Sequence, residues 1–172
     1  MALTAGTWRI VDGVVGAQPI ADRSTTAQHP LGKIVRARDA GTTDYGEAEF
    51  IYVKGVANGA AKAWAGYPSD NYTSVLAVAN GNYPIGIMMA ALTASYYGWL
   101  QISGKALGSC LTSFGDNGIV FLTSTAGSID DASVTGDWVT GALGASAAVI
   151  GDLHAEFEIA RPFAAQRVTI AG

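Results

Sequence analysis

The residues that could carry acid–base or nucleophilic chemistry are few, because the sequence has two histidines, His29 and His154, and one cysteine, Cys110. A serine or cysteine nucleophile needs a base beside it. His29 precedes Pro30, which favours a surface or docking role, and His154 lies on the polar side of an alternating pattern. No Gly-x-Ser-x-Gly elbow or Cys-x-x-Cys pair accompanies either histidine. The sequence therefore predicts a protein that is not an enzyme, with no catalytic residues, no metal site and no cofactor.

Two pairs of carboxylates keep one enzymatic alternative open. Glu47 and Glu49 form one pair, and Glu156 and Glu158 form the other. Paired carboxylates can hydrolyse a glycosidic bond when a cleft holds them about 5 to 9 Å apart. Alternation along a strand also places residues i and i+2 on one face without any catalytic purpose. A deep pocket enclosing two close carboxylates would support a small hydrolase.

The composition predicts one folded domain with an unusually apolar surface. The 172 residues are 49% hydrophobic and only 14% charged, with a mean hydropathy of +0.26. Ordinary soluble domains carry about 25% charged residues. The 22 glycines and the aromatic side chains fit short strands joined by tight turns. Since a lone cysteine permits no internal disulfide, burial and backbone pairing must hold the fold, and Cys110 is expected to be buried and inert.

Charge is distributed unevenly along the chain. Residues 1–38 carry five cations and two carboxylates, whereas residues 39–172 carry five cations and twelve carboxylates. With a pI near 4.9, the chain lacks the clustered basic face that nucleic-acid binding requires. The longest weakly polar run, 84–94, falls short of the roughly 20 residues of a membrane helix, and no basic segment precedes an apolar stretch at the N-terminus. We expect no nucleic-acid partner, no membrane and no secretory leader.

The first 30 residues are predicted to form an extended N-terminal arm, with at most one short strand at 7–11. Large apolar side chains are sparse there, and glycine, proline and a polar run interrupt them. Such a segment cannot form a layer of its own, so we expect the arm to dock on a neighbouring molecule and to lie outside the core. Aromatic and guanidinium side chains are favoured interface anchors. The candidate interface residues are Trp8, Arg9, Arg23, His29, Arg36 and Arg38.

Residues 31–172 are predicted to form a single β domain, the body. Its short alternating segments recur with turn residues between them, and no window has the spacing of a long helix. The expected strands are 31–38, 47–56, 62–67, 73–79, 85–92, 96–104 (with 105–111 as an extension), 119–123, 137–141, 145–150 and 153–163. The fold class is therefore all-β, a mainly antiparallel β-barrel or β-sandwich of about ten short strands.

Four segments of this body are similar to a family of tailed-bacteriophage structural proteins. They are PLGKIVRA at 30–37, YGEAEFIYVKGV at 45–56, YGWLQISGKA at 97–106 and EFEIARPF at 156–163. Proteins of this family are capsid decoration, or cement, proteins. The resemblance implies a protein on the outer surface of the virion head that binds the major capsid protein and stabilises contacts between capsomers. It brings no catalytic residues with it.

Self-association is a further expectation. Decoration proteins commonly occupy local symmetry axes of the head, so closed cyclic association is natural and a homotrimer is favoured over a dimer. A carbohydrate-binding or host-adhesion module is the alternative function. That alternative requires Trp64, Trp99 or Trp138 on an exposed platform, whereas core or interface positions are the ordinary role of tryptophan.

Overall fold

A computed structural model describes residues 3–41, 44–133 and 137–165 of the chain. These residues form twelve strands and no helix. The strands are β1 (Trp8–Ile10), β2 (Ile34–Asp39), β3 (Glu47–Lys54), β4 (Trp64–Gly66), β5 (Val75–Leu76), β6 (Tyr83–Met88), β7 (Tyr97–Gln101), β8 (Ser103–Ser109), β9 (Ile119–Leu122), β10 (Ile129–Asp130), β11 (Trp138–Gly144) and β12 (His154–Ala165).

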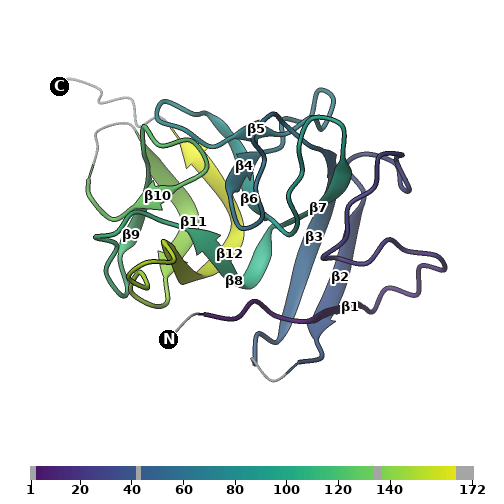
Figure 1. Cartoon of the computed structure of the whole chain (residues 1–172), viewed down its shortest axis with the longest axis horizontal. Coiled ribbons are helices and arrows are strands. Elements are labelled where there is room, and N and C mark those ends of the chain that lie inside the picture. Colours follow the sequence, from purple (N-terminus) through teal and green to yellow (C-terminus); the bar gives the residue numbers. More distant parts are fainter. Residues whose placement is uncertain (1–2, 42–43, 134–136, 166–172) are drawn as a thin grey trace.

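The strands form one connected sheet that does not close into a barrel. The path runs β1-β2-β3-β7-β6-β12-β11-β9-β10, and β4, β5 and β8 branch from it. Within the described residues every pairing between these strands is antiparallel. Strands β1, β2, β3 and β7 lie toward one end of the long axis, and β9, β10 and β11 lie at the other (Figure 1). The all-β, antiparallel fold class is confirmed.

Most of the predicted strands form close to their expected positions, and one does not. The 31–38 and 47–56 segments make the expected hairpin, with Ile34 opposite Ile51 and Arg38 opposite Glu47. The strand predicted at 145–150 is wrong, because that segment is a loop and Ile150 is 95% exposed. The run of alanine and serine offers no β-branched or aromatic side chain until its end, so little packing holds it on a sheet.

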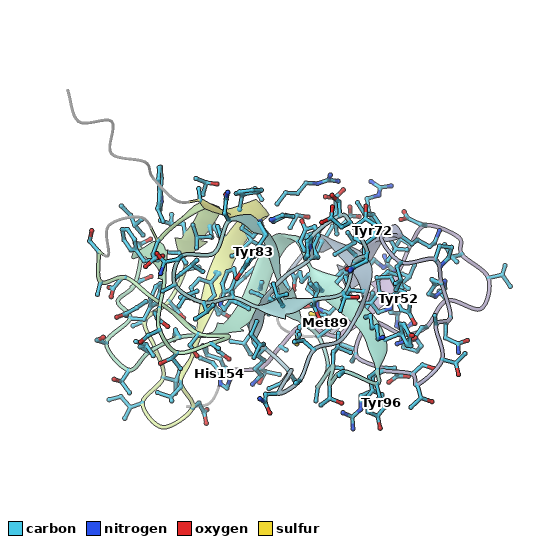
Figure 2. All side chains as sticks on the ribbon, turned by 90° about the horizontal axis from the view of Figure 1, so that it is seen from above. Tyr52, Tyr72, Tyr83, Met89, Tyr96 and His154 are labelled. Atoms are coloured by element: carbon cyan, nitrogen blue, oxygen red, sulfur yellow. The ribbon has the colours of Figure 1, made fainter. Side chains whose placement is uncertain are left out.

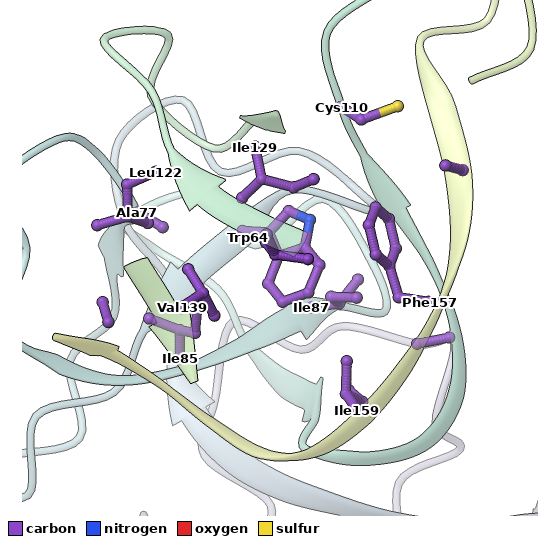
Figure 3. Packing of buried hydrophobic residues seen from close by; sticks show 14 of the residues in the cluster. Trp64, Ala77, Ile85, Ile87, Cys110, Leu122, Ile129, Val139, Phe157 and Ile159 are labelled. Atoms are coloured by element: carbon purple, nitrogen blue, oxygen red, sulfur yellow. The ribbon is translucent and has the colours of Figure 1, made fainter. Parts of the chain in front are cut away.

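The described hydrophobic side chains gather in three buried clusters along the long axis. The largest lies between β4, β6, β8, β9, β11 and β12 and centres on Trp64 and Phe157, whose rings meet edge to face at 5.1 Å (Figure 3). The second packs Leu100 and Ile102 against β3 and β4. The third packs Phe50, Tyr52 and Trp99 beneath the N-terminal arm. Burial of these side chains is the main stabilising contribution to the fold.

A β-bulge reshapes the outer side of β11. Gly141 has a φ of +71°, and a Cβ atom at this position would lie 2.7 Å from the carbonyl oxygen of Ala160. Only glycine fits both constraints. The pairing register with β12 shifts between Thr140 and Ala142, so Leu143 points outward, on the same side as Trp138.

The N-terminal arm belongs to the body, and the expectation that it lies outside the core is wrong. Strand β1 pairs with β2, so that Trp8, Arg9 and Ile10 lie opposite Asp39, Arg38 and Ala37. Ile20 is 1% exposed and belongs to the third cluster. The arm is poor in apolar residues, but the few that it has are placed where they cover Phe50 and Trp99. A sparse segment can dock in this way because the body already presents an apolar surface.

Gln18 fixes the middle of the arm. Its side-chain amide donates to the carbonyl oxygens of Asp22 and Tyr97 at 2.8 and 3.2 Å, and its side-chain oxygen accepts from the Tyr52 hydroxyl at 2.7 Å. Its backbone carbonyl accepts from the Trp99 indole N–H at 3.0 Å. Gln18 is 7% exposed, so in the folded chain these hydrogen bonds take the place of the hydrogen bonds that its polar groups make to water when the chain is unfolded.

Candidate functional site

Three of the predicted interface arginines come together on the outer side of β1 and β2. Arg9 lies directly opposite Arg38 across the two strands, and Arg36 is two residues before Arg38 on the same face. All three side chains are exposed. We call this set the arginine row. Like charges directly opposite one another across an antiparallel pair repel, so the row is a place where an anionic partner would be favourable.

The arginine row is only partly neutralised by the chain itself. Arg36 forms an ion pair with Asp12 at 3.3 Å. Nearby on β3, Glu49 is held by Arg161 through two hydrogen bonds of 3.1 and 3.2 Å. Among the described residues, Arg9 and Arg38 make no ion pair, although Arg38 lies across from Glu47 in the strand register. Arg9 and Arg38 are therefore the two members of the row without an ion pair among the described residues.

Trp8 and Arg23, the next two predicted interface residues, lie outside this row. Trp8 is half-buried and packs edge to face on Phe50 and Tyr45, with ring centroids 5.1 and 6.2 Å apart. Arg23 donates to the carbonyl oxygen of Ala91 at 2.7 Å, and its guanidinium lies 4.2 Å from the ring centroid of Tyr96. Tyr96 is at the margin of the molecule, away from Tyr52 in the interior (Figure 2). Both residues fasten the arm to its own body.

His29 also acts inside the molecule. Its Nε2 accepts a hydrogen bond of 3.0 Å from the backbone N–H of Gln18, which requires a neutral ring with the proton on Nδ1. The ring packs against Tyr52 at 5.1 Å and Trp99 at 5.4 Å. Burial, and then the charge of Lys33, lowers the pKa of His29 from its ordinary value of 6.5. His29 therefore binds the arm and the body of its own chain.

A second surface, which the sequence analysis did not identify, lies on the outer side of β9, β11 and β12. Here Trp138 lies opposite Phe121, and Leu143 lies opposite Ile119. Exposure is 41% for Trp138, 41% for Leu143, 53% for Ile119 and 38% for Phe163. We call this surface the apolar face; it comprises Ile119, Phe121, Trp138, Leu143 and Phe163. The alternating pattern at 119–123 could have indicated that Ile119 and Phe121 face outward. No pattern in the sequence indicates the bulge that turns Leu143 outward.

A shallow depression lies within the apolar face, beside the bulge. Its volume is about 440 Å³, and its lining residues are Gly141, Ala142, Leu143, Glu158, Ile159 and Ala160. Glu158 is its one acidic lining residue, so it offers no carboxylate pair for glycoside hydrolysis. Of the other paired carboxylates, Glu49 is held by Arg161, and Glu156 binds Lys105 at 2.9 Å and the Tyr45 hydroxyl at 2.9 Å. Glu47 lies on β3, opposite Arg38 in the strand register.

Cys110 and His154, the remaining residues that could carry chemistry, lie in buried or partly buried positions. Cys110 is 1% exposed, and burial together with Asp130 and Asp131 raises its thiol pKa to about 11, so it is protonated at neutral pH. Burial of Cys110 is confirmed. His154 is partly buried beside Lys62, and burial lowers its pKa. Across residues 3–41, 44–133 and 137–165, no group of three or more His, Cys, Asp or Glu side chains could hold a metal ion.

The tryptophans divide between core and surface. Trp64 and Trp99 are 0% exposed, so neither can serve on a glycan-binding platform. Trp138, at 41% exposed, is the one member of the predicted set that reaches the surface. Stacking against a sugar ring would therefore depend on Trp138 and its neighbours on the apolar face.

No protein-family model, no curated protein and no solved structure matches the chain. The resemblance to phage decoration proteins thus depends on the four sequence segments alone. In the part of the chain that the structure describes, no helix is long and apolar enough to cross a membrane.

Proposed function

We propose that the chain is a structural virion protein that decorates the outer surface of a tailed-phage head. It binds the major capsid protein and stabilises contacts between capsomers, and it works by surface burial without catalysis, cofactor, nucleic acid or membrane. It acts as a closed homo-oligomer, with a trimer favoured over a dimer.

The observation that carries this proposal is the apolar face. It exposes four large hydrophobic side chains on neighbouring strands, and the depression beside Leu143 is shallow. Contiguous exposed apolar area marks an interaction surface in most soluble proteins. A broad, nearly flat surface suits a protein partner better than a small substrate, which would require a deeper pocket.

The four resembling segments lie in paired strands of the sheet. Segments 30–37, 45–56 and 97–106 supply most of β2, all of β3 and β7, and the first part of β8, and segment 156–163 lies within β12. Strands β2, β3 and β7 are consecutive neighbours, and β8 pairs with β12 along seven residues. The resemblance therefore covers the scaffold of the sheet. Most of the apolar face lies outside these segments.

Binding of the purified chain to phage heads that lack it tests the proposal. We expect the chain to co-sediment with such heads to a fixed saturating ratio and to raise the temperature at which they release DNA. Heads that already carry their full complement are the matched control and should bind no more. Absence of saturable binding to the deficient heads would contradict the proposed function.

The glycan-binding alternative is favoured by one observation, the exposure of Trp138. If the chain is an adhesion module, a glycan array should show binding that Trp138→Ala abolishes and Phe163→Ala leaves partly intact. Under the decoration proposal, neither the chain nor its variants bind any glycan on the array.

A further inference from the structure

The depression on the apolar face is chemically suited to one kind of side chain. The exposed Leu143 and Ala160 and the half-buried Ala142 form its apolar wall, and the exposed Glu158 is its acidic lining residue. Ile159 also lines it but is only 5% exposed, since its side chain belongs to the core. Within the described residues Glu158 makes no ion pair. A long aliphatic stem that ends in a cation would cover the apolar wall and neutralise this carboxylate. Arginine fits best, because its planar guanidinium can bind a carboxylate through two parallel hydrogen bonds.

The chain carries such side chains at its other end. Arg9 and Arg38 are exposed, lie opposite one another and have no ion pair among the described residues. Exposed apolar side chains accompany them, since Val11 is 42% exposed and Ile34 is 39% exposed. Both surfaces therefore expose apolar side chains, and the arginines of the row are opposite in charge to Glu158 on the apolar face. Strands β1 and β2 lie far along the molecule from β9 and β11 (Figure 1), so one chain presents the two surfaces in different places.

We propose that copies of this chain associate head to tail, with the arginine row of one copy seated on the apolar face of the next so that Arg38 and Arg9 meet Glu158. The inference depends on the proposed function for its premise that the chain works as a closed oligomer, and it assigns the surfaces between copies. Repeated contacts of this kind between unlike surfaces close into a ring when the rotation per copy divides a full turn.

A two-fold arrangement of apolar face on apolar face is less favourable on charge. In that arrangement Glu158 of each copy would enter an apolar interface without a free cation opposite it. Lys105 lies directly opposite Glu158 in the register of β8 and β12, but it is paired with Glu156 at 2.9 Å. Arg161, the nearest cation along β12, is already held by both carboxylate oxygens of Glu49. Burying an uncompensated carboxylate is costly. The head-to-tail contact supplies the missing cation, and the like-charge repulsion between Arg9 and Arg38 is relieved at the same time.

Charge exchange between the two surfaces tests this assignment. Sedimentation velocity would be measured on the wild-type chain, Glu158→Arg, Arg38→Glu and the double variant that combines both. We expect each single variant to weaken association by at least about tenfold, in keeping with close charge pairs at interfaces. The double variant should recover most of the loss, because the pair is restored with its signs reversed. Asp70→Arg, at an exposed carboxylate in the loop before β5, is the matched control and should associate as the wild type does.

The outcomes separate this inference from the proposed function. A monomeric wild-type chain at tens of micromolar, single variants that associate normally, or a double variant that shows no recovery would each overturn the head-to-tail contact. A Glu158→Arg chain that associates normally but fails to bind deficient heads would identify the apolar face as a capsid contact, which also overturns the head-to-tail contact. Association that behaves as expected, together with no binding to heads, supports the contact and contradicts the proposed function alone.

Discussion

Strand β12 and the N-terminal arm are held against the same body by different kinds of interaction. Strand β12 is twelve residues long and pairs through its backbone with β11, β8 and β6. The arm contributes a strand of three residues, and beyond it depends on the side chains of Gln18, Ile20 and His29. Backbone pairing is available to nearly any side chain, whereas a side-chain anchor is lost with one substitution.

This difference predicts where each region is vulnerable. In β12, damage should follow from core packing and should affect the whole fold. In the arm, single substitutions should release one segment while the body stays folded.

Phe157→Ala should be the most damaging substitution in β12. Phe157 is 0% exposed and packs against Trp64 and Phe114 at ring distances of 5.1 and 5.2 Å. Removal of a buried phenylalanine ring costs about 3–5 kcal/mol. Urea unfolding measures the loss, and Phe163→Ala, on the exposed side of the same strand, is the control with a much smaller effect. Equal losses for the two variants would contradict the packing described here.

Ile20→Ala should be the most damaging single substitution in the arm. Ile20 is 1% exposed in the third cluster, and truncation of a buried isoleucine costs about 2–5 kcal/mol. Val15→Ala, at a side chain that is 100% exposed, should change stability little. Limited proteolysis should show cleavage of the arm before cleavage of the body in Ile20→Ala. If Ile20→Ala is as stable as Val15→Ala, the arm does not contribute to the core.

Gln18→Leu should weaken the arm by a smaller amount. The substitution removes the acceptor of the buried Tyr52 hydroxyl and the donor to the carbonyl oxygens of Asp22 and Tyr97. Leaving buried polar groups unsatisfied costs about 1–3 kcal/mol. Gln28→Leu is the control, because the Gln28 side chain is exposed and bonds only to Ser24 and Thr26. A smaller stability loss in Gln18→Leu than in Gln28→Leu would show that Gln18 does not anchor the arm.

The smallest effect expected is a pH dependence of the arm. Since burial lowers the pKa of His29 below 6.5, the stabilisation by neutral His29 is complete above about pH 6.5 and is lost as the pH falls through the folded-state pKa. Protonation also removes the acceptor for the Gln18 N–H. The protection of the Gln18 amide against hydrogen exchange should therefore fall in acid.

Two variants test the origin of that pH dependence. His29→Gln should abolish the acid-induced change in Gln18 protection. His154→Gln should retain it, because the pKa of His154 is also lowered, by burial and then Lys62, but no hydrogen bond joins His154 to the arm in the described structure. If His154→Gln alone abolished the pH dependence, the titrating group would be His154, and the role given to His29 would be contradicted.

Local patterns in the sequence were sufficient to predict the fold class and the hairpin of β2 and β3. The alternation of Val35 and Ala37 with Arg36 and Arg38 is visible in four consecutive residues, and it predicts the buried and exposed faces observed. The arm could not be predicted in this way, because Ile20 and Gln18 acquire their roles from Trp99 and Tyr52, which are far away along the chain. Composition shows how few large apolar residues the arm has, but it does not show which surface of the body they pack against.

The candidate surfaces, like the fold, could be predicted only in part from the sequence. The sequence predicted that Arg9, Arg36 and Arg38 lie in one interface, and strand pairing does bring them together. It also placed Trp8, Arg23 and His29 there, and these bind the chain's own body. The apolar face was missed because its Leu143 faces outward only after the register shift at Gly141. A bulge of one residue is a tertiary feature that no strict alternation reveals.

Under the proposed function the chain belongs to a phage particle, and an electron cryo-microscopy map of that particle is the most direct test. We expect density for all twelve strands of the chain on the outer surface of the head, in contact with the major capsid protein at the junctions between capsomers. Density for the chain in the tail or its fibres, or a complete particle that lacks the chain, would contradict it.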